Sequence, residues 1–203
     1  MKKIILIGAF VEIIELCEKC GYSIEGVVDE LSDRKFCGYD VLGNDDFIIS
    51  NKEKFLDSKL IMVPDKPLIR EKLYKRYKAA GFSFETVISS GANVSKYAVI
   101  EEGAIVQDFC NVSANAHIGR CARLNVGANV MHDSTVGDFS ILAPNCVVLG
   151  RSSIGEKCYV GANSTILPEK TIGNEAVIGA SSVVTKNVGK GLTVIGNPAR
   201  VMV

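Results

Sequence analysis

Residues 142–166 read LAPNCVVLGRSSIGEKCYVGANSTI, and an aliphatic residue returns in this stretch at every sixth position. Four residues after each aliphatic position, from Ala98 to Ser182, stands a small residue, Ala, Ser or Cys, with Lys170 as the one exception in that range. Such a run is an internal repeat, which has to be interpreted before any single motif. The sixteen aliphatic positions are Val94, Ile100, Val106, Val112, Ile118, Leu124, Val130, Val136, Leu142, Val148, Ile154, Val160, Ile166, Ile172, Ile178 and Val184.

A period of six residues fits neither the 3.6-residue turn of a helix nor the alternation of an ordinary strand. It fits short strands joined by tight corners, with three strands in a coil of about eighteen residues. Aliphatic side chains then stack inside and small residues fill the crowded corners. The pattern resembles the hexapeptide repeat of the left-handed parallel β-helix, and the left hand is implied by that resemblance alone. Sixteen repeats make about five coils, which is enough for a continuous core.

The composition is that of a soluble globular protein, with 47% apolar and 23% charged residues among 203. Its 23 basic and 23 acidic residues cancel, which argues against nucleic acid or an anionic membrane as a partner. The chain opens with MKKIILIGAF, and the apolar run that begins there ends at Glu12. No small-residue cleavage site follows, so this stretch predicts a buried strand rather than a signal peptide. No run approaches the roughly 18 to 20 apolar residues of a membrane span. We expect a cytoplasmic protein.

The cysteines and histidines give no reason to expect a metal. Cys17 and Cys20 form a C-x-x-C inside a helical pattern, without a second pair or nearby histidines, which favours structural filler over a metal or redox role. Carbonic anhydrases built on the same β-helix need three histidine ligands, and this chain has only His117 and His132. His117 is interpreted as a flank or interface histidine.

The first ninety residues predict a small α/β domain. A strand over 2–9, a helix over 11–20 and a strand over 23–29 outline a Rossmann-like nucleotide-binding half-domain with a parallel sheet. Further on we expect a strand over 59–63, an amphipathic helix over 68–80 and a strand over 82–90. Ile69, Leu73, Tyr77 and Ala80 should face inward from that helix, and its basic residues should form a solvated face. We place the boundary near Gly91, with residues 1–90 in this domain and residues 91–203 in the β-helix.

The nucleotide-binding outline is incomplete. The glycine turn is only Gly8-Ala9-Phe10, without the later glycines that let a backbone approach phosphates, and Asp29 ends the second strand. This favours a structural strand–turn–helix over an NAD site.

His132 and Asp133 are the residues best suited to acid–base chemistry. They lie in the run 124–139, LNVGANVMHDSTVGDF, beside a corner and off the inward aliphatic register. A carboxylate beside an imidazole favours the protonated ring and fixes its tautomer, which suits a general base. A lone His-Asp dipeptide is more often an ordinary surface pair.

The spacing Leu124-Asn125, then six residues, then His132-Asp133-x-x-Val136-Gly137-Asp138-Phe139-Ser140 resembles the active-site coil of bacterial sugar-nucleotide acetyltransferases of the PglD and NeuD types. The closing Ile195-Gly196-Asn197-Pro198-Ala199-Arg200 resembles the G-x-P-A-[KR] motif of hexapeptide acyltransferases, which implies use of acetyl-CoA. The resemblance covers the whole chain. It implies a homotrimer in which each active site draws on two neighbouring β-helices.

The resemblance also implies roles for single residues. His132 would be the catalytic base, Asp133 the acid that supports it, and Asn125 would lie beside the acceptor sugar. The acetyl-CoA contacts would be Ile141, which replaces a histidine of the best-known members, and Gly150, Ala162 and Ala180. The nucleotide part of the substrate would contact Gly8, Ala9, Phe10, Asp29 and Asp65, although Gly8-Ala9-Phe10-Val11 and Pro64-Asp65 depart from the loops usual in that family.

We therefore expect an acetyl-CoA-dependent N-acetyltransferase that acts by direct attack of the amino group of a nucleotide-linked amino sugar. Two alternatives stay open: an O-acetyltransferase of a sugar or sialic-acid-like hydroxyl, and a non-catalytic β-helix binding protein.

Overall fold

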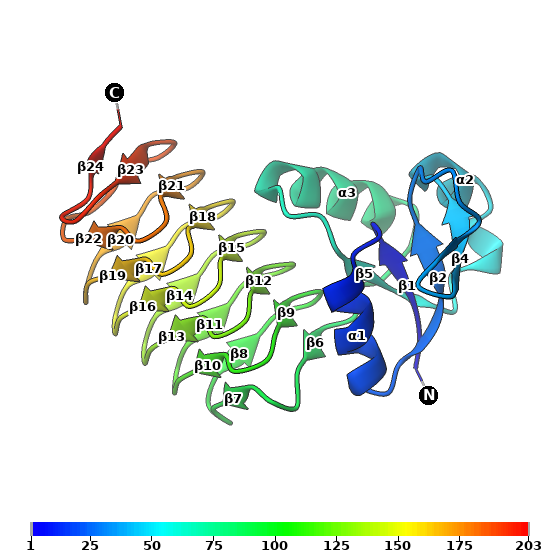
Figure 1. Cartoon of the computed structure of the whole chain (residues 1–203), viewed down its shortest axis with the longest axis horizontal. Coiled ribbons are helices and arrows are strands. Elements are labelled where there is room, and N and C mark those ends of the chain that lie inside the picture. The colour runs from blue at the N-terminus through cyan, green and yellow to red at the C-terminus, as the bar shows by residue number, and fades with distance from the viewer. Residues whose placement is uncertain (1, 203) are drawn as a thin grey trace. The chain divides into compact units, whose positions relative to one another are not determined.

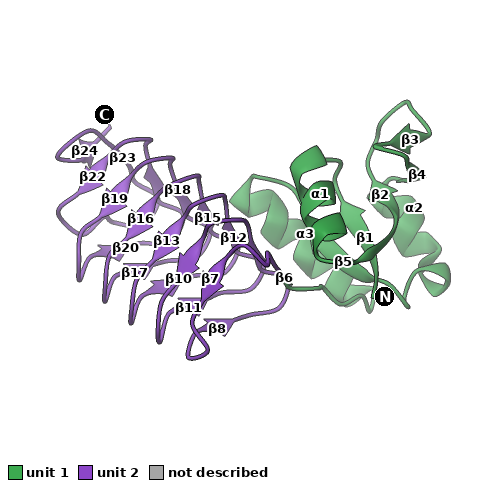
Figure 2. Ribbon diagram, turned by 60° about the horizontal axis from the view of Figure 1, so that its bottom comes forward, with its two compact units in different colours: residues 1–87 green, residues 88–203 purple. Residues whose placement is uncertain are grey.

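The computed structural model describes residues 2–202, and the chain divides into two compact units, 1–87 and 88–203 (Figure 2). The division falls between Val87 and Ile88, and each unit is described by itself. The first unit is an α/β fold and the second a left-handed parallel β-helix, as the sequence predicts.

The first unit is built on a five-stranded sheet with the order β3-β4-β2-β1-β5 (Figure 2). The neighbours β1–β2, β1–β5 and β2–β4 are parallel, and only β3 runs antiparallel to β4. The parallel strands carry the buried aliphatic residues, which is typical of a sheet covered by helices. The elements of the first unit are β1 (Lys3–Ile7), α1 (Val11–Lys19), β2 (Ser23–Val28), β3 (Lys35–Phe36), β4 (Tyr39–Gly43), α2 (Asp45–Ser50), the 3-10 helix η1 (Lys52–Lys54), β5 (Lys59–Met62) and α3 (Pro67–Ala79).

Two predictions for this unit are wrong in detail. Ile69 is 41% exposed, and Arg70 is the fully buried residue of that turn of α3. The Arg70 guanidinium reaches the end of β5, where Nη1 donates to the carbonyl oxygens of Met62 at 3.0 Å and Pro64 at 2.7 Å. Burial of an arginine is tolerated when its donors are satisfied in this way. The strand expected over 82–90 is reduced to a single bridge between Leu60 and Phe84 and to the two-residue β6.

The second unit is a stack of short strands, nearly all of two residues, in three sheets (Figure 1). The pairs are parallel except for the last one, in which β24 runs antiparallel to β23. The first sheet holds β7 (Asn93–Val94), β10 (Asn111–Val112), β13 (Asn129–Val130), β16 (Val147–Val148), β19 (Thr165–Ile166) and β22 (Val183–Val184). The second holds β8 (Val99–Ile100), β11 (His117–Ile118), β14 (Thr135–Val136), β17 (Ser153–Ile154) and β20 (Thr171–Ile172). The third holds β6 (Val87–Ile88), β9 (Ile105–Val106), β12 (Arg123–Leu124), β15 (Ile141–Leu142), β18 (Tyr159–Val160), β21 (Val177–Ile178), β23 (Thr193–Ile195) and β24 (Arg200–Val201).

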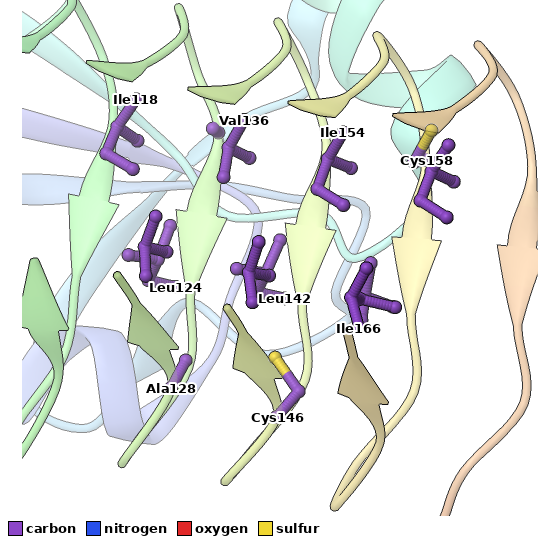
Figure 3. Packing of buried hydrophobic residues seen from close by; sticks show 14 of the residues in the cluster. Ile118, Leu124, Ala128, Val136, Leu142, Cys146, Ile154, Cys158 and Ile166 are labelled. Atoms are coloured by element: carbon purple, nitrogen blue, oxygen red, sulfur yellow. The ribbon is translucent and has the colours of Figure 1, made fainter. Parts of the chain in front are cut away.

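From β7 to β22 the register of these sheets pairs residues that are eighteen apart, for example Asn111 with Asn129 and Leu124 with Leu142. The last coil is shorter, and β21 pairs β23 with an offset of sixteen residues. Each coil before the last therefore repeats the preceding one, and the aliphatic residues of the repeat stack in columns inside the prism (Figure 3). Fourteen of the sixteen predicted positions, from Val106 to Val184, are buried in one cluster, and Val94 and Ile100 at the N-terminal end are partly buried against it.

The small residues of the repeat are explained by hydrogen bonds between coils. The buried hydroxyls of Ser134, Ser140 and Ser152 donate to carbonyl oxygens fifteen residues further on, at 3.0, 2.8 and 2.9 Å. The thiol of Cys158 does the same to the carbonyl of Gly173 at 3.2 Å. Burial raises the pKa of Cys146 to about 12, so this thiol stays protonated and behaves as a compact apolar group.

The inward columns should dominate stability. Replacing Leu142, which has no exposed surface, by Ala should lower the free energy of unfolding by about 2 to 5 kcal/mol. Replacing the exposed Thr171 by Ala should change it by less than about 0.5 kcal/mol. Denaturant unfolding of both variants measures this difference. Equal effects would contradict the assignment of the interior.

Candidate active site

His132 and Asp133 form a hydrogen-bonded pair at a corner of the β-helix. The turn at 131–134 joins β13 of the first sheet to β14 of the second, and we call this edge, in every coil, the His132 corner. Asp133 adopts a left-handed backbone with φ of 57°, which Asp tolerates better than most residues. His132 Nδ1 lies 2.8 Å from Asp133 Oδ2, and the two side chains are 51% and 45% exposed. Both therefore lie on the flank of the prism, as predicted.

The geometry of the pair decides which ring nitrogen can accept a proton. An ionised carboxylate only accepts hydrogen bonds, so Nδ1 of the neutral ring carries the proton and Nε2 presents a lone pair. The hydrogen bond from His132, and a second from Asn115 Nδ2 at 3.0 Å, hold the pKa of the Asp133 carboxyl below its ordinary value. The carboxylate thus stays charged near neutral pH and can stabilise an imidazolium.

Gly150 lies one coil further along the same corner, against the His132 ring. The Arg151 N–H donates to the His132 carbonyl at 3.0 Å and ties the two coils together. A Cβ added to Gly150 would meet His132 Cε1 and Nε2, each at 2.7 Å. The proton-accepting nitrogen therefore lies over a glycine because no larger residue leaves room for the ring. The Gly150 N–H donates to no acceptor within residues 2–202.

Three other predicted residues lie at a different corner. Asn125 follows β12, Ala162 follows β18 and Ala180 follows β21, so all three lie where the third sheet turns into the first. We call this edge the Asn125 corner. A strand with its flanking turn, six residues in all, separates it from the His132 corner, which is about 20 Å of extended chain. A single chain brings His132, Asp133 and Gly150 together but does not bring Asn125, Ala162 or Ala180 to them.

Ile141 does not fit its predicted place as a contact of acetyl-CoA. It belongs to the two-residue strand β15, just before the Asn125 corner, and only 1% of its surface is exposed. A buried side chain on a strand offers no surface to a ligand. We therefore leave Ile141 out of the site.

The five residues predicted to contact the nucleotide line one hollow in the first unit. Gly8, Ala9, Phe10, Asp29 and Asp65 surround a volume of about 270 Å³ at the carboxyl ends of β1, β2 and β5, where parallel α/β sheets bind their ligands. Asp29 closes the turn, because Oδ2 accepts from the Ala9 N–H at 2.9 Å and Oδ1 from the Glu30 N–H at 2.8 Å.

Some residues that shape these sites were not predicted. A second hollow of about 190 Å³ shares Gly8, Asp29 and Pro64 with the first and adds Glu30, Asn44 and Asp45. A third, of about 180 Å³, lies at the C-terminal end of the β-helix and is lined by Lys186 and Arg200 with apolar residues. Asn115 is a further residue of the site that the sequence does not predict, although it stands eighteen residues before Asp133 and therefore lies beside it in the preceding coil.

Among residues 2–202, no group of three or more His, Cys, Asp or Glu side chains is placed to hold a metal ion. In the same range, no helix is long and apolar enough to cross a membrane.

The family comparison identifies the repeat. Residues 151–186 match the model of the bacterial transferase hexapeptide (six repeats). No curated protein matches the sequence significantly.

Solved structures of other proteins are similar to this chain over its whole length. A GDP-perosamine N-acetyltransferase from Caulobacter crescentus, a histidine-to-alanine variant in complex with CoA and GDP-perosamine, has a TM-score of 0.95 at 29% identity and covers 100% of this chain and 98% of its own. The acetyltransferase domain of PglB from Neisseria gonorrhoeae FA1090, in complex with acetyl coenzyme A, has a TM-score of 0.92 at 25% identity, with 99% of both chains covered. WeeI from Acinetobacter baumannii AYE has a TM-score of 0.89 at 28% identity, with both chains fully covered.

The contact between Gly150 and His132 can be tested without any substrate. In a Gly150→Ala variant the new methyl group would occupy the space of the imidazole, and the exposed ring should swing away while the fold is kept. Ring signals of His132 in NMR spectra should shift, and those of His117, the only other histidine, should stay in place as an internal reference. Unchanged His132 signals would show that the ring does not lie on Gly150 in solution.

The likeness to acetyltransferases thus rests on both units together, and the matched repeat lies in the β-helix that carries His132. The chain is therefore an acyltransferase whose second unit is a left-handed parallel β-helix.

Proposed function

We propose that the chain transfers the acetyl group of acetyl-CoA to the amino group of a nucleotide-linked amino sugar. The observation that carries this proposal is the His132–Asp133 pair, with Nε2 over Gly150, in a chain that is similar over its full length to a GDP-perosamine N-acetyltransferase. Both proposed substrates are small and water-soluble, and we assign the reaction to the cytoplasm.

His132 acts as the general base in this proposal. Nε2 takes a proton from the amine as the amine nitrogen forms its bond to the thioester carbonyl carbon, and Asp133 stabilises the resulting imidazolium through Nδ1. The Gly150 N–H donates to the carbonyl oxygen as it becomes negative. When the carbon–sulfur bond breaks, His132 returns the proton to the thiolate of CoA. Direct attack suffices, and no covalent acyl-enzyme is needed.

The His132 corner also offers a path for the rest of acetyl-CoA. Gly150, Pro168 and Lys186 follow His132 at intervals of eighteen residues, so Lys186 lies three coils, about 14 Å, along the same edge. Lys186 and Arg200 line the C-terminal hollow. Their positive charges suit the phosphate groups of CoA, and the thioester end would then lie beside Nε2 of His132.

The separation of the two corners supports an assembly with shared active sites. Asn125, Ala162 and Ala180 can contribute to the site at His132 only from a neighbouring chain, if a homotrimer places the Asn125 corner of one subunit against the His132 corner of the next. Asn125 would then contact the acceptor sugar, and Ala162 and Ala180 would contact acetyl-CoA.

The two hollows of the first unit are proposed to hold the nucleotide. Their lining includes the carboxylates of Asp29, Glu30, Asp45 and Asp65 and no Lys or Arg. Carboxylates accept hydrogen bonds from ribose hydroxyls and from N–H groups of a base, and they repel phosphates. We therefore assign this surface to the nucleoside and not to the diphosphate.

The reaction is tested by mass spectrometry of products formed from acetyl-CoA and a panel of amino and hydroxyl nucleotide sugars. The wild-type chain should acetylate an amino sugar, and His132→Ala should be slower by about a hundredfold or more. His117→Ala is the matched control, because that histidine lies on the face of the second sheet in an exposed pair with Glu101. If products form only from hydroxyl acceptors, the reaction is O-acetylation and the proposed N-acetylation is wrong. Absence of any product, together with no binding of acetyl-CoA by calorimetry, would favour a non-catalytic protein.

The shared site is tested by mixing two inactive variants. His132→Ala damages the His132 corner, and Ala162→Trp blocks the Asn125 corner with a bulky side chain. In trimers assembled from equal amounts of both, about a quarter of the sites combine two intact corners, so activity should return. Mixed trimers that form and stay inactive would show that each chain holds a complete site.

A further inference from the structure

We propose that Asn115 is a positioning residue of the acyltransferase site, which holds the Asp133 carboxylate in the orientation that receives His132. This inference rests on the proposed function. Asn115 Nδ2 donates to Asp133 Oδ1 at 3.0 Å, and the other oxygen, Oδ2, lies 2.8 Å from His132 Nδ1. Each oxygen of the carboxylate thus has its own donor, one from the preceding coil and one from the neighbouring residue.

The backbone of the β-helix places Asn115 directly before Asp133 in the same column. The two residues are eighteen apart, both have left-handed backbones with φ of 59° and 57°, and the Asp133 N–H donates to the Ala114 carbonyl at 3.1 Å. Asn is one of the few residues that tolerate this conformation and also carry a side-chain donor. An aspartate in its place would set two carboxylates side by side.

Asn115 is needed because Asp133 has a competing partner. Arg151 occupies the same column in the following coil, and its positive charge acts on the Asp133 carboxylate. Arg151 Nε instead donates to Glu169 Oε1 at 3.0 Å, which draws the guanidinium toward the next coil. Asn115 on one side and Glu169 on the other therefore keep Asp133 and Arg151 apart. Without the amide of Asn115, the exposed carboxylate could rotate toward Arg151 and leave the imidazole.

Loss of the carboxylate would change the chemistry of His132 directly. Asp133 keeps the proton of the neutral ring on Nδ1, and this leaves the lone pair of Nε2 over Gly150. A surface pair of adjacent residues fixes its own geometry only weakly, because both side chains are free to turn into solvent. A second hydrogen bond to the same carboxylate removes that freedom. The role of Asn115 is therefore to select the tautomer and direction of the ring.

The test uses two variants of the full-length chain. Asn115→Gly removes the amide and accepts a positive φ without strain, and Asn115→Asp keeps the shape but replaces the donor by a second carboxylate. Glu175→Gly is the matched control, because Glu175 has a φ of 64° at a corner that carries no proposed site residue. Thermal unfolding of all three variants checks that the fold is kept. Long-range ¹⁵N–¹H NMR spectra report the tautomer of His132, with His117 as the reference.

We expect the Nδ1–H tautomer of His132 to dominate in the wild type and to mix with the Nε2–H tautomer in both Asn115 variants. The control should keep the wild-type spectrum. The kcat for acetyl transfer should fall by about tenfold or more in Asn115→Gly, with KM values for both substrates nearly unchanged, because the defect lies in orientation and not in binding. A wild-type His132 spectrum in folded Asn115→Gly would overturn the proposal.

The two readouts separate this inference from the proposed function. If the wild-type chain acetylates no acceptor but the tautomers mix as expected, the proposed function fails and the positioning role of Asn115 stands. If acetylation by the wild type is confirmed and Asn115→Gly keeps both its kcat and its tautomer, the positioning role fails and the proposed function stands.

Discussion

The stacking of identical coils eighteen residues apart is the constraint on which the rest of the second unit depends. Once the inward aliphatic columns are buried, the residues outside them in the coils before the last have their neighbours assigned by position, because residue i lies between i−18 and i+18. The His132 ring lies on Gly150 for this reason, and Asp133 lies between Asn115 and Arg151. The residues that meet at one corner are therefore spaced eighteen apart in the sequence and do not form a continuous segment.

The β-helix could be predicted from the sequence because its signal is both local and repeated. A single aliphatic residue does not predict a fold. Loss of one inward aliphatic side chain, however, would leave a cavity in the packed prism, and the chain keeps Val, Ile or Leu at every such position. The first unit lacks such redundancy. The sequence predicts the wrong face for α3, because hydrophobicity favours burial of Ile69 over Arg70. The burial of Arg70 depends on two carbonyl oxygens at the end of β5. The strand expected over 82–90 is apolar enough, yet its backbone pairs in two short separate pieces, one around Phe84 and one at β6, and not as one continuous strand.

The site was predictable to the extent that sequence neighbours or a simple register define it. His132 and Asp133 are adjacent, and their pairing follows from that adjacency. Gly8 and Asp29 meet because carboxyl ends of neighbouring parallel strands meet. The sequence does not predict Asn115, because its partner Asp133 lies a whole coil away. It does not predict Glu30, in the loop after β2, or Asp45, the first residue of α2, because neither belongs to a recognisable motif. Ile141 was placed in the site by alignment with a histidine of related enzymes, and no spacing within this chain supported it.

A prism of this kind is rigid along its columns, and that rigidity limits how it can build an active site. Groups at one corner can be held closely against one another, as His132, Asp133 and Gly150 are, but no movement within a chain can bring the Asn125 corner to them. A second copy supplies the opposite wall at no cost to the packing of the first, because its corner already presents small side chains at Ala162 and Ala180. The same rigidity leaves only side-chain rotation free at the reacting groups. Hydrogen bonds between coils, such as that from Asn115, are then the means by which a fixed backbone selects one orientation of its catalytic pair.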